Sequence, residues 1–203
     1  MAPRRYSLGK RAQTVEDTRR RIVEATFALH NEKGPINTSM QDVAERADVA
    51  LRTVYHHFPT INDLIDGCGG KVIEVLAPPT PAIFAGLSTL EGRVRRLVGE
   101  LFAVYERGAV PIEGARCQQN EFPALANFVR NEQAMRESLV REALRPFGLK
   151  PRVVREVAAV TDFYVWRAFN QRDVSTHRAA AIVSGALVAY IISVEPGKKG
   201  RTK

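Results

Sequence analysis

Apolar positions near the start of the chain recur at helical spacing. From Thr14 onward the repeat follows i, i+3, i+4 and i+7, which predicts a helix with one buried face. The residues on that face are Ile22, Ala25, Thr26 and Leu29. Thr14 with Asp17 three residues later gives a start signal, and Gly34 followed by Pro35 ends the helix. His30 falls beside the face, so we expect it to pack in the core.

Two shorter helical patterns follow. The first has Thr38 as N-cap and Gln41 at its third position. Its apolar side consists of Met40, Val43, Ala44 and Ala47. A tight connection at Asp48 and Val49 leads into the second pattern, residues 50–58. Together with the first helix, these two segments predict a small three-helix unit at the N-terminus.

Residues 50–58 divide into two faces when they are placed on a helix. The apolar residues gather within about 60° of each other and must pack inward: Leu51, Val54 and Phe58. The polar residues on the opposite face are Arg52, Thr53 and His56, with Tyr55 and His57 on the two flanks.

A fourth helix, residues 61–76, restarts the chain after Pro59. Thr60 with Asp63 three residues later supplies its start signal. Glycines interrupt its second half, and each costs about 1 kcal/mol relative to alanine within a helix: Gly67, Gly69 and Gly70. We therefore expect this connecting helix to be weak or kinked, and compliant at the glycines.

The segment APPTP, residues 77–81, is the clearest boundary, because its prolines cannot all be helical. Beyond it no stretch alternates convincingly like a strand, and four long helical patterns dominate: residues 89–107, 121–145, 151–171 and 175–194. The predicted fold is all-α, with an N-terminal helix-turn-helix domain joined to a larger C-terminal helical bundle. The predicted parts are a basic flexible tail (1–13), the helix-turn-helix domain (14–60), a connecting helix (61–76), the bundle (77–195) and a second basic tail (196–203).

Composition narrows the class of protein. A chain of 203 residues can bury a core without disulfides, so we expect Cys68 and Cys117 to be buried, inert thiols. No apolar segment follows the basic start, which argues against a signal peptide and favours a cytoplasmic location. The longest apolar stretch, residues 179–194, falls short of the ~18–20 residues of a membrane span. We interpret it as a buried helix and expect no membrane partner.

The positive charge is concentrated at the two ends. The formal net charge is +8. Residues 1–21 carry seven Lys and Arg against two acidic residues, and the tail from Pro196 carries four with no acid. The body between them is close to neutral. The distribution favours a polyanionic partner, and the first basic segment runs into a helix where it could lie along phosphates.

Metal and catalytic chemistry are poorly supported. His56 and His57 are adjacent, so a regular helix cannot direct both at one ion, whereas helical zinc sites space two histidines at i and i+4. The sequence has no Gly-x-Ser-x-Gly elbow and no glycine loop followed by Lys-Ser or Lys-Thr. We expect no enzymatic activity, no metal and no cofactor.

The polar face of residues 50–58 suits the major groove of B-DNA, which is about 12 Å wide and admits one helix. Arg52 could pair with a guanine edge, while Thr53, Tyr55 and one histidine could donate to phosphates. A solvated helix face without a partner is the alternative. The pattern alone leaves both open.

A longer run, RRIVEATFALHNEKGPINTSMQDVAERADVALRTVYHHFPTINDLI, carries several fixed spacings at once. These are Ile-x-x-Ala in a helix ending at Gly, then Thr-Ser-Met-x-Asp-Val-Ala, then Thr-Val-Tyr-x-His-Phe. The run, residues 20–65, resembles the DNA-binding domain of TetR-family transcriptional regulators. The resemblance implies a homodimer on operator DNA, with residues 50–58 as recognition helix. It implies DNA contacts from Thr38, Ser39, Gln41, Arg52, Thr53, Tyr55, His56 and His57.

Four positions depart from the family's pattern. Asp48 stands where glycine is usual in the turn, and Ala50 replaces a capping serine. Ile61 replaces a lysine that reaches phosphate, and His30 stands where an aromatic residue is typical. The geometry of the turn, the helix cap and one backbone contact are therefore in question.

The second half resembles the family only loosely. The resemblance implies a dimer interface in residues 144–192, where small residues would permit close helix approach: Ala179, Ala180, Ser184, Gly185, Ala186 and Ala189. It also implies a small, largely apolar effector bound among residues 90–168. Candidate effector contacts are Phe102, Tyr105, Phe128, Met135 and Trp166. For both sets, packing in an intrachain core is the alternative.

These features predict a sequence-specific transcriptional regulator, a repressor released from a palindromic operator by its effector. Two other functions stay open. One is an all-α enzyme or small-molecule carrier that uses a cavity in the second half. The other is an activator that binds DNA without a ligand.

Overall fold

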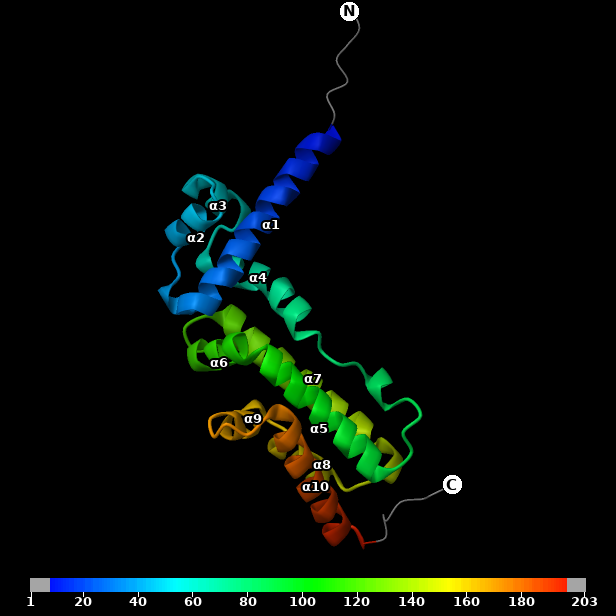
Figure 1. Ribbon diagram of the computed structural model, residues 1–203. Coiled ribbons are helices and arrows are strands. Elements are labelled where there is room, and N and C mark those ends of the chain that lie inside the picture. Colours follow the sequence, from blue (N-terminus) through cyan, green and yellow to red (C-terminus); the bar gives the residue numbers. More distant parts are fainter. Residues whose placement is uncertain (1–7, 197–203) are drawn as a thin grey trace, which may run out of the picture. The chain divides into compact units, whose positions relative to one another are not determined.

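The structure, a computed structural model, describes residues 8–196 and is all-α over that range, as the sequence predicts (Figure 1). It divides into two compact units. The first consists of residues 1–74 and 110–129, and the second of residues 75–109 and 130–203. This division differs from the predicted one, because residues 110–129 group with the N-terminal helices instead of the C-terminal bundle.

The first unit contains the helix-turn-helix. Its N-terminal elements are α1 (Leu8–Lys33), η1 (Pro35–Asn37), α2 (Met40–Arg46), α3 (Leu51–His57) and α4 (Ile61–Leu76). The apolar stripes predicted for these helices form one core, in which the most deeply buried side chains are Ile22, Val43, Val54 and Leu64. The bounds predicted for α4 are confirmed, and Thr60 caps it as expected, since its hydroxyl accepts the backbone N–H of Asp63 while the Asp63 carboxylate accepts the Thr60 N–H.

The predicted start of the first helix is wrong. α1 begins at Leu8, so residues 8–13, expected to be a flexible tail, are helical, and Thr14 lies inside the helix. No proline separates Leu8 from Thr14, and although Gly9 is a poor helix former, the four residues after it (Lys, Arg, Ala and Gln) are good ones that outweigh a capping signal. The predictions for residues 1–7 and 197–203 lie outside the described residues.

The predicted N-cap of the second helix is displaced by one residue. Ser39 is the cap of α2, and its hydroxyl accepts from the backbone N–H of Asp42 while the Asp42 carboxylate accepts from the Ser39 N–H. A reciprocal box of this kind satisfies two free backbone donors. The Thr38 hydroxyl instead donates to the carbonyl of Gly34 at 2.9 Å and is buried.

Gly67 in α4 has a packing role that the sequence did not reveal. The Phe58 ring rests against its backbone, and a methyl group at Gly67 would overlap that ring. Gly69 and Gly70 face open space. α4 is continuous through all three glycines, and its weakness or kink at these positions stays a prediction.

The rest of the first unit is a hairpin of α6 (Ala109–Gln118) and the start of α7 (Pro123–Leu144). α6 was not predicted, because Pro111 and Gly114 resemble helix breaks. Pro111 lies in the first turn, where a backbone N–H has no helical partner to lose. The hairpin and α4 share a small second core formed by Ile65, Ala115, Ala124, Leu125 and Val129.

The second unit is a helical bundle built on α5 and α10. Its elements are η2 (Pro81–Phe84), α5 (Leu90–Arg107), the remainder of α7, η3 (Arg145–Phe147), α8 (Pro151–Val160), α9 (Phe163–Asn170) and α10 (Thr176–Val194). α10 packs along α5, with α9 against both (Figure 1). The single helix predicted over residues 151–171 is two, because Asp162 caps α9 by accepting from the backbone N–H of Tyr164.

α10 is only partly the buried helix that the sequence predicts. With 19 residues it is long and apolar enough to cross a membrane by length and composition. One face packs inward through Ala179, Val183, Leu187 and Ile191. A second stripe at i, i+3, i+4 and i+7 is exposed: Ile182, Gly185, Ala186 and Ala189. The six small residues predicted for an interface therefore do not all lie on the exposed face, because Ala179 and Ser184 face the core.

Candidate nucleic-acid interface

α3 presents the polar face that its sequence predicts. Val54 is fully buried and Phe58 nearly so, which turns the opposite side outward. Arg52 and His56 are exposed, Tyr55 retains 48% of its surface, and Thr53 and His57 are half-buried. The structure thus brings all five predicted side chains of α3 to one exposed surface or its edges.

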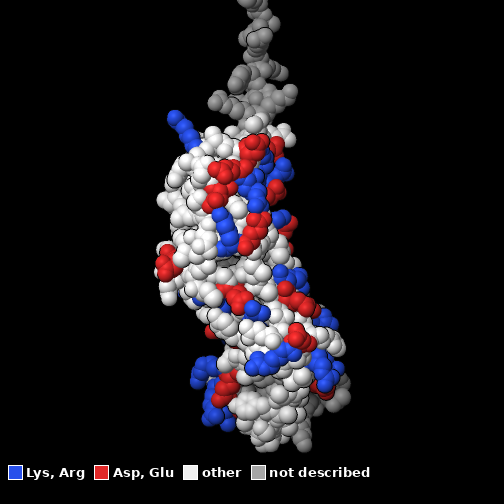
Figure 2. Space-filling model, turned by 60° about the vertical axis from the view of Figure 1, so that its left-hand side comes forward, with Lys and Arg blue, Asp and Glu red and all other residues white. Residues whose placement is uncertain are grey.

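Arg52 differs from Arg20, Arg21 and Arg46 of this unit. Within the described residues it makes no ion pair and no side-chain hydrogen bond. Arg20 pairs with Asp17, and Arg46 forms a two-pronged pair with Glu32 at 2.7 and 2.8 Å. Such pairs are widespread, and Figure 2 shows basic and acidic side chains interleaved over the face that it presents. Arg52 therefore keeps its donors available for an external acceptor.

His57 sits at the edge of this surface. Burial lowers the pKa of His57, and the neighbouring His56 and Arg19 lower it further. The His56 and His57 rings meet edge to face with centroids 5.5 Å apart. A neutral imidazole at His57 can donate one hydrogen bond but carries no charge toward a phosphate.

The residues predicted on α2 are mostly engaged within the protein. Besides the buried Thr38, Ser39 donates its hydroxyl to Asp42 at 2.6 Å. Gln41 is exposed and donates to Glu45 at 2.7 Å. Because this hydrogen bond lies on the surface, an external partner can replace it. Of the three predicted residues on this helix, Gln41 is thus the best placed to reach a partner, whereas Thr38 is not presented.

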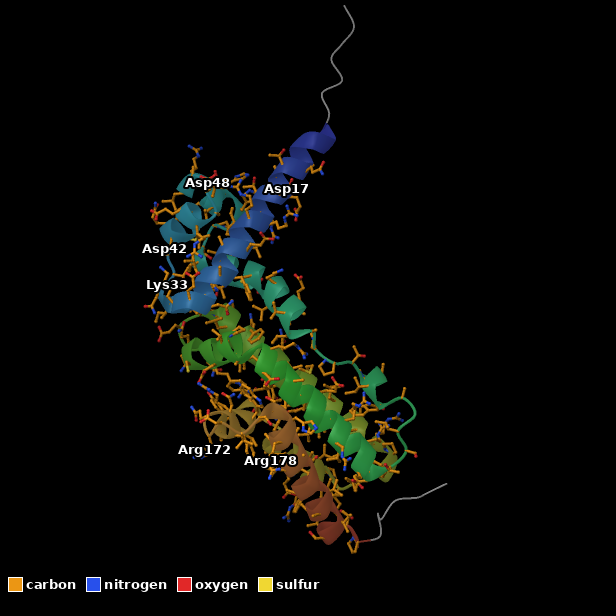
Figure 3. All side chains as sticks on the ribbon, in the orientation of Figure 1. Asp17, Lys33, Asp42, Asp48, Arg172 and Arg178 are labelled. Carbon is orange, nitrogen blue, oxygen red and sulfur yellow. The ribbon has the colours of Figure 1, made fainter. Side chains whose placement is uncertain are left out.

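A network of charge stabilises the start of α2. Lys33, at the end of α1, lies 3.0 Å from Asp42 (Figure 3). Hydrogen bonds from Ser39 and from Lys33 lower the pKa of Asp42 to about 2. A carboxylate in the first turn also favours the positive end of the helix dipole.

The turn between α2 and α3 has an aspartate where glycine is usual, and it keeps the left-handed backbone that glycine favours. Asp48 adopts a left-handed backbone with φ of 52°, and Figure 3 shows it between the two helices. Arg21 on α1 donates to the backbone carbonyls of Ala47 and Asp48 at 2.5 and 2.7 Å. Ala50 caps α3 without a side-chain hydrogen bond, as expected. No local pattern indicated this role of Arg21, because its partners lie 26 and 27 residues away.

The residues predicted to contact an effector are not brought together. Phe102, Tyr105 and Trp166 lie in a fully buried aromatic cluster of the second unit. Phe128 instead packs on the small core of the first unit, and Met135 is half-buried. The packing explanation thus accounts for at least three of the five.

The aromatic cluster contains buried polar groups. The Tyr105 hydroxyl donates to the carbonyl of Thr161 at 3.0 Å and lies 3.4 Å from Glu132. Arg136 donates to the carbonyl of Ala158 and pairs with Asp162 at 3.2 Å. Elsewhere in this unit a surface hollow of about 380 Å³ lies among η2, the end of α7 and the start of α8, and none of the predicted effector residues lines it.

Comparison with known proteins agrees with the geometry of the first unit. Residues 22–68 match the family model for bacterial regulatory proteins of the tetR family. The chain thus carries a DNA-binding domain of the tetR type. It is 35% identical over 107 residues to the HTH-type transcriptional repressor KstR of Mycolicibacterium smegmatis, a match covering 52% of this chain and 51% of that protein. The chain thus spans about half the length of that curated relative.

Solved TetR-type structures share the fold over most of the chain. A tetR-family regulator from Streptomyces coelicolor superposes with a TM-score of 0.65 at 17% identity, covering 90% of this chain and 85% of that one. The multidrug binding protein EbrR complexed with proflavin gives a TM-score of 0.61 at 22% identity, over 85% and 98%. At such identities the likeness establishes the fold alone. The match over residues 22–68 identifies the N-terminal helices as a helix-turn-helix of the tetR type.

Proposed function

We propose that this chain is a homodimeric TetR-family repressor, located in the cytoplasm, that binds a palindromic operator and is released by a small, largely apolar effector. The observation that carries the DNA-binding part is Arg52. It stands on the exposed face of α3 with its donors uncommitted, while Arg20 and Arg46 nearby are paired. An arginine with free donors on a groove-sized helix suits bidentate pairing with guanine.

The other side chains of α3 have complementary roles in this proposal. Thr53, Tyr55 and His56 contact phosphates or base edges around Arg52, and Gln41 adds a contact from α2. Ile61 supplies none, because it is half-buried and packs against both cores of the first unit. The operator contact that a lysine at this position provides in the family is therefore replaced by packing.

The exposed stripe of α10 supports the homodimer. Ile182, Gly185, Ala186 and Ala189 present an apolar surface whose small side chains let a second helix approach closely. A symmetric dimer would bury this stripe against its own copy. Two recognition helices about 34–36 Å apart would then enter successive major grooves on one side of the duplex.

The effector part of the proposal rests on the polar groups inside the aromatic cluster. Tyr105, Glu132 and Arg136 supply donors and acceptors among apolar walls, which is the composition of small-molecule sites. A structural relative, EbrR, is a multidrug binding protein by its name. An effector that separates this cluster would favour a dimer whose recognition helices no longer match the operator spacing.

Selection of bound sequences from a random duplex pool, repeated at several salt concentrations, tests the DNA-binding part. We expect an inverted repeat and a steep loss of affinity with salt. Arg52→Ala should weaken binding by about 1–3 kcal/mol, mainly at one base pair of each half-site. Loss that is equal for all sequences would make Arg52 a phosphate contact only.

The same selection separates the first alternative, and its repetition in the presence of small apolar molecules separates the second. An enzyme or carrier predicts no enrichment of any sequence. An activator that lacks an effector predicts an inverted repeat whose binding no small molecule reverses.

A further inference from the structure

Gln118, the last residue of α6, bonds to the loop that leads into α2. Its Oε1 accepts the backbone N–H of Ile36, in η1, at 2.9 Å. The two residues are 82 positions apart in the sequence. A backbone donor in a loop that has no helical partner is thus satisfied from another helix of the same unit.

Two glycines lie at this contact. Gly34, with φ of 81°, ends α1, and a Cβ there would lie 3.1 Å from the Gln118 Nε2. Gly114 lies one turn before Gln118 on α6, and a Cβ there would lie 4.0 Å from Pro35. The face of α6 that carries residues 114 and 118 therefore rests directly on the loop before α2.

Asn62 makes a second bond of the same kind at the other end of the helix-turn-helix. Its Oδ1 accepts the backbone N–H of Ala124 at 2.9 Å. Ala124 is the second residue of α7, where a backbone N–H has no partner within the helix. A side chain at the start of α4 thus caps the start of α7.

The small second core lies between these two bonds. Ile65 on α4 packs with Ala115 of α6 and with Ala124 of α7, and all three are buried. Ile61 contacts both this core and that of the helix-turn-helix. Residues 110–129, hereafter the tip, are therefore joined to the DNA-binding helices by continuous packing. On each side of this packing a side-chain amide oxygen accepts a hydrogen bond.

We propose that Gln118 and Asn62 are positioning residues for DNA binding. Gln118 holds the loop before α2 against the tip, and Asn62 holds the start of α4 against the tip. The position of the tip therefore determines how α2 and α3 are oriented toward the major groove of DNA. This inference rests on the proposed function, since it concerns the same DNA-binding surface.

The test compares variants of the full chain in which the substituted side chain has about the original size. The variants differ in whether that side chain keeps an oxygen that can accept the hydrogen bond. Gln118→Met and Asn62→Leu remove the accepting oxygen, whereas Gln118→Glu and Asn62→Asp retain one. Gln119→Met is the matched control, because among the described residues the Gln119 side chain, one position past the end of α6, donates only to the carbonyl of Arg116. Two quantities are measured: amide hydrogen exchange at Ile36 and Ala124, and affinity for the operator duplex obtained by selection.

We expect Gln118→Met to speed exchange at Ile36 by tenfold or more and to weaken operator binding several-fold. Asn62→Leu should do the same with exchange at Ala124. Gln118→Glu, Asn62→Asp and Gln119→Met should remain close to the unaltered chain in both measurements. Circular dichroism identifies a variant that no longer folds. If the variants at one of the two positions, 118 or 62, do not fold, those at the other position supply the test.

Unchanged exchange in Gln118→Met and Asn62→Leu would overturn the proposal. Faster exchange with unaltered operator affinity would overturn it as well, because the bonds would then be structural only. If the unaltered chain enriches no duplex sequence, the proposed function itself fails. That outcome is distinct from operator binding that is intact and insensitive to both residues.

Discussion

Arg21 and Asp48, 27 residues apart, are joined by a hydrogen bond of 2.7 Å from the guanidinium to the backbone carbonyl of Asp48. The same group donates to the carbonyl of Ala47 and lies 3.6 Å from the Asp48 carboxylate. It therefore binds both carbonyls at the end of α2 and the one acidic side chain of the turn. This explains how a residue other than glycine holds a left-handed backbone between the two DNA-binding helices.

Removing this guanidinium should loosen the turn. We expect Arg21→Ala to lower the free energy of unfolding by about 1–2 kcal/mol, the lower end of charge-assisted hydrogen bonds, since the arginine is partly exposed. Urea titration followed by circular dichroism measures the loss. Arg20→Ala is the control, because Arg20 pairs only with Asp17 on an exposed surface. Equal effects of the two substitutions would contradict the role assigned to Arg21.

The three glycines of α4 should respond in opposite directions. Gly67→Ala would force the Phe58 ring out of its place, at a cost of about 1–3 kcal/mol for overpacking. Gly69→Ala and Gly70→Ala meet open space and should stabilise the chain by up to about 1 kcal/mol each. The midpoint temperatures of thermal unfolding of the three single variants measure these changes in stability. Stabilisation by Gly67→Ala would refute the packing role of that glycine.

The helical stripes were predictable because each was a local pattern that burial then enforced. Ile22, Val43 and Val54 are core residues in the sequence pattern and in the structure. The errors arose where a local signal met a competing one. Thr14 carries a capping signal inside a longer helix, and Pro111 looks like a break but occupies a first turn that tolerates it.

The candidate site could be predicted on α3 and only partly beyond it. The periodicity of residues 50–58 fixed which side chains point outward, and this needed no tertiary information. Arg21, Gln118 and Asn62 act on backbone groups 26 to 82 residues away. Such pairings depend on how distant segments meet, so spacing along the chain carries no trace of them. Aromatic residues such as Phe102 and Phe128 gave the same signal for core and for pocket.

Acid should destabilise the protein through His30. Burial lowers the pKa of His30 to about 4 from its ordinary 6.5, and its Nε2 has no hydrogen-bond partner among the described residues. Between pH 6.5 and 4 the unfolded chain therefore binds a proton at this position while the folded chain does not. Stability is lost as the pH falls through this window, by up to about 3 kcal/mol.

His30→Phe should remove that dependence. The variant leaves no buried nitrogen without a partner and no proton to bind on unfolding, so we expect its advantage over the unaltered chain to grow from pH 7 to pH 4. Chemical denaturation at a series of pH values measures the difference. A constant difference between His30→Phe and the unaltered chain would show that His30 titrates alike in both states.

The two cysteines should differ sharply in reactivity. Burial raises the pKa of the Cys68 thiol to about 12, whereas Cys117 is exposed, contrary to the expectation that both are buried. Since the thiolate is the reactive form, a thiol reagent at pH 8 should modify Cys117 at once and Cys68 only when the first unit opens. Mass spectrometry of peptides over time distinguishes the sites. Equal rates in the folded protein would contradict the packing of Cys68.

The exposed stripe of α10 gives a direct test of the homodimer. Ala186 is exposed within that stripe, so Ala186→Arg should leave the fold intact while placing a charge, and its image, at the centre of a symmetric interface. We expect sedimentation equilibrium to change from dimer to monomer, and operator affinity to fall because one half-site is bound at a time. His177→Arg adds the same charge to α10 off the stripe and should remain dimeric. If Ala186→Arg stays dimeric with unaltered operator binding, the two subunits meet through another surface.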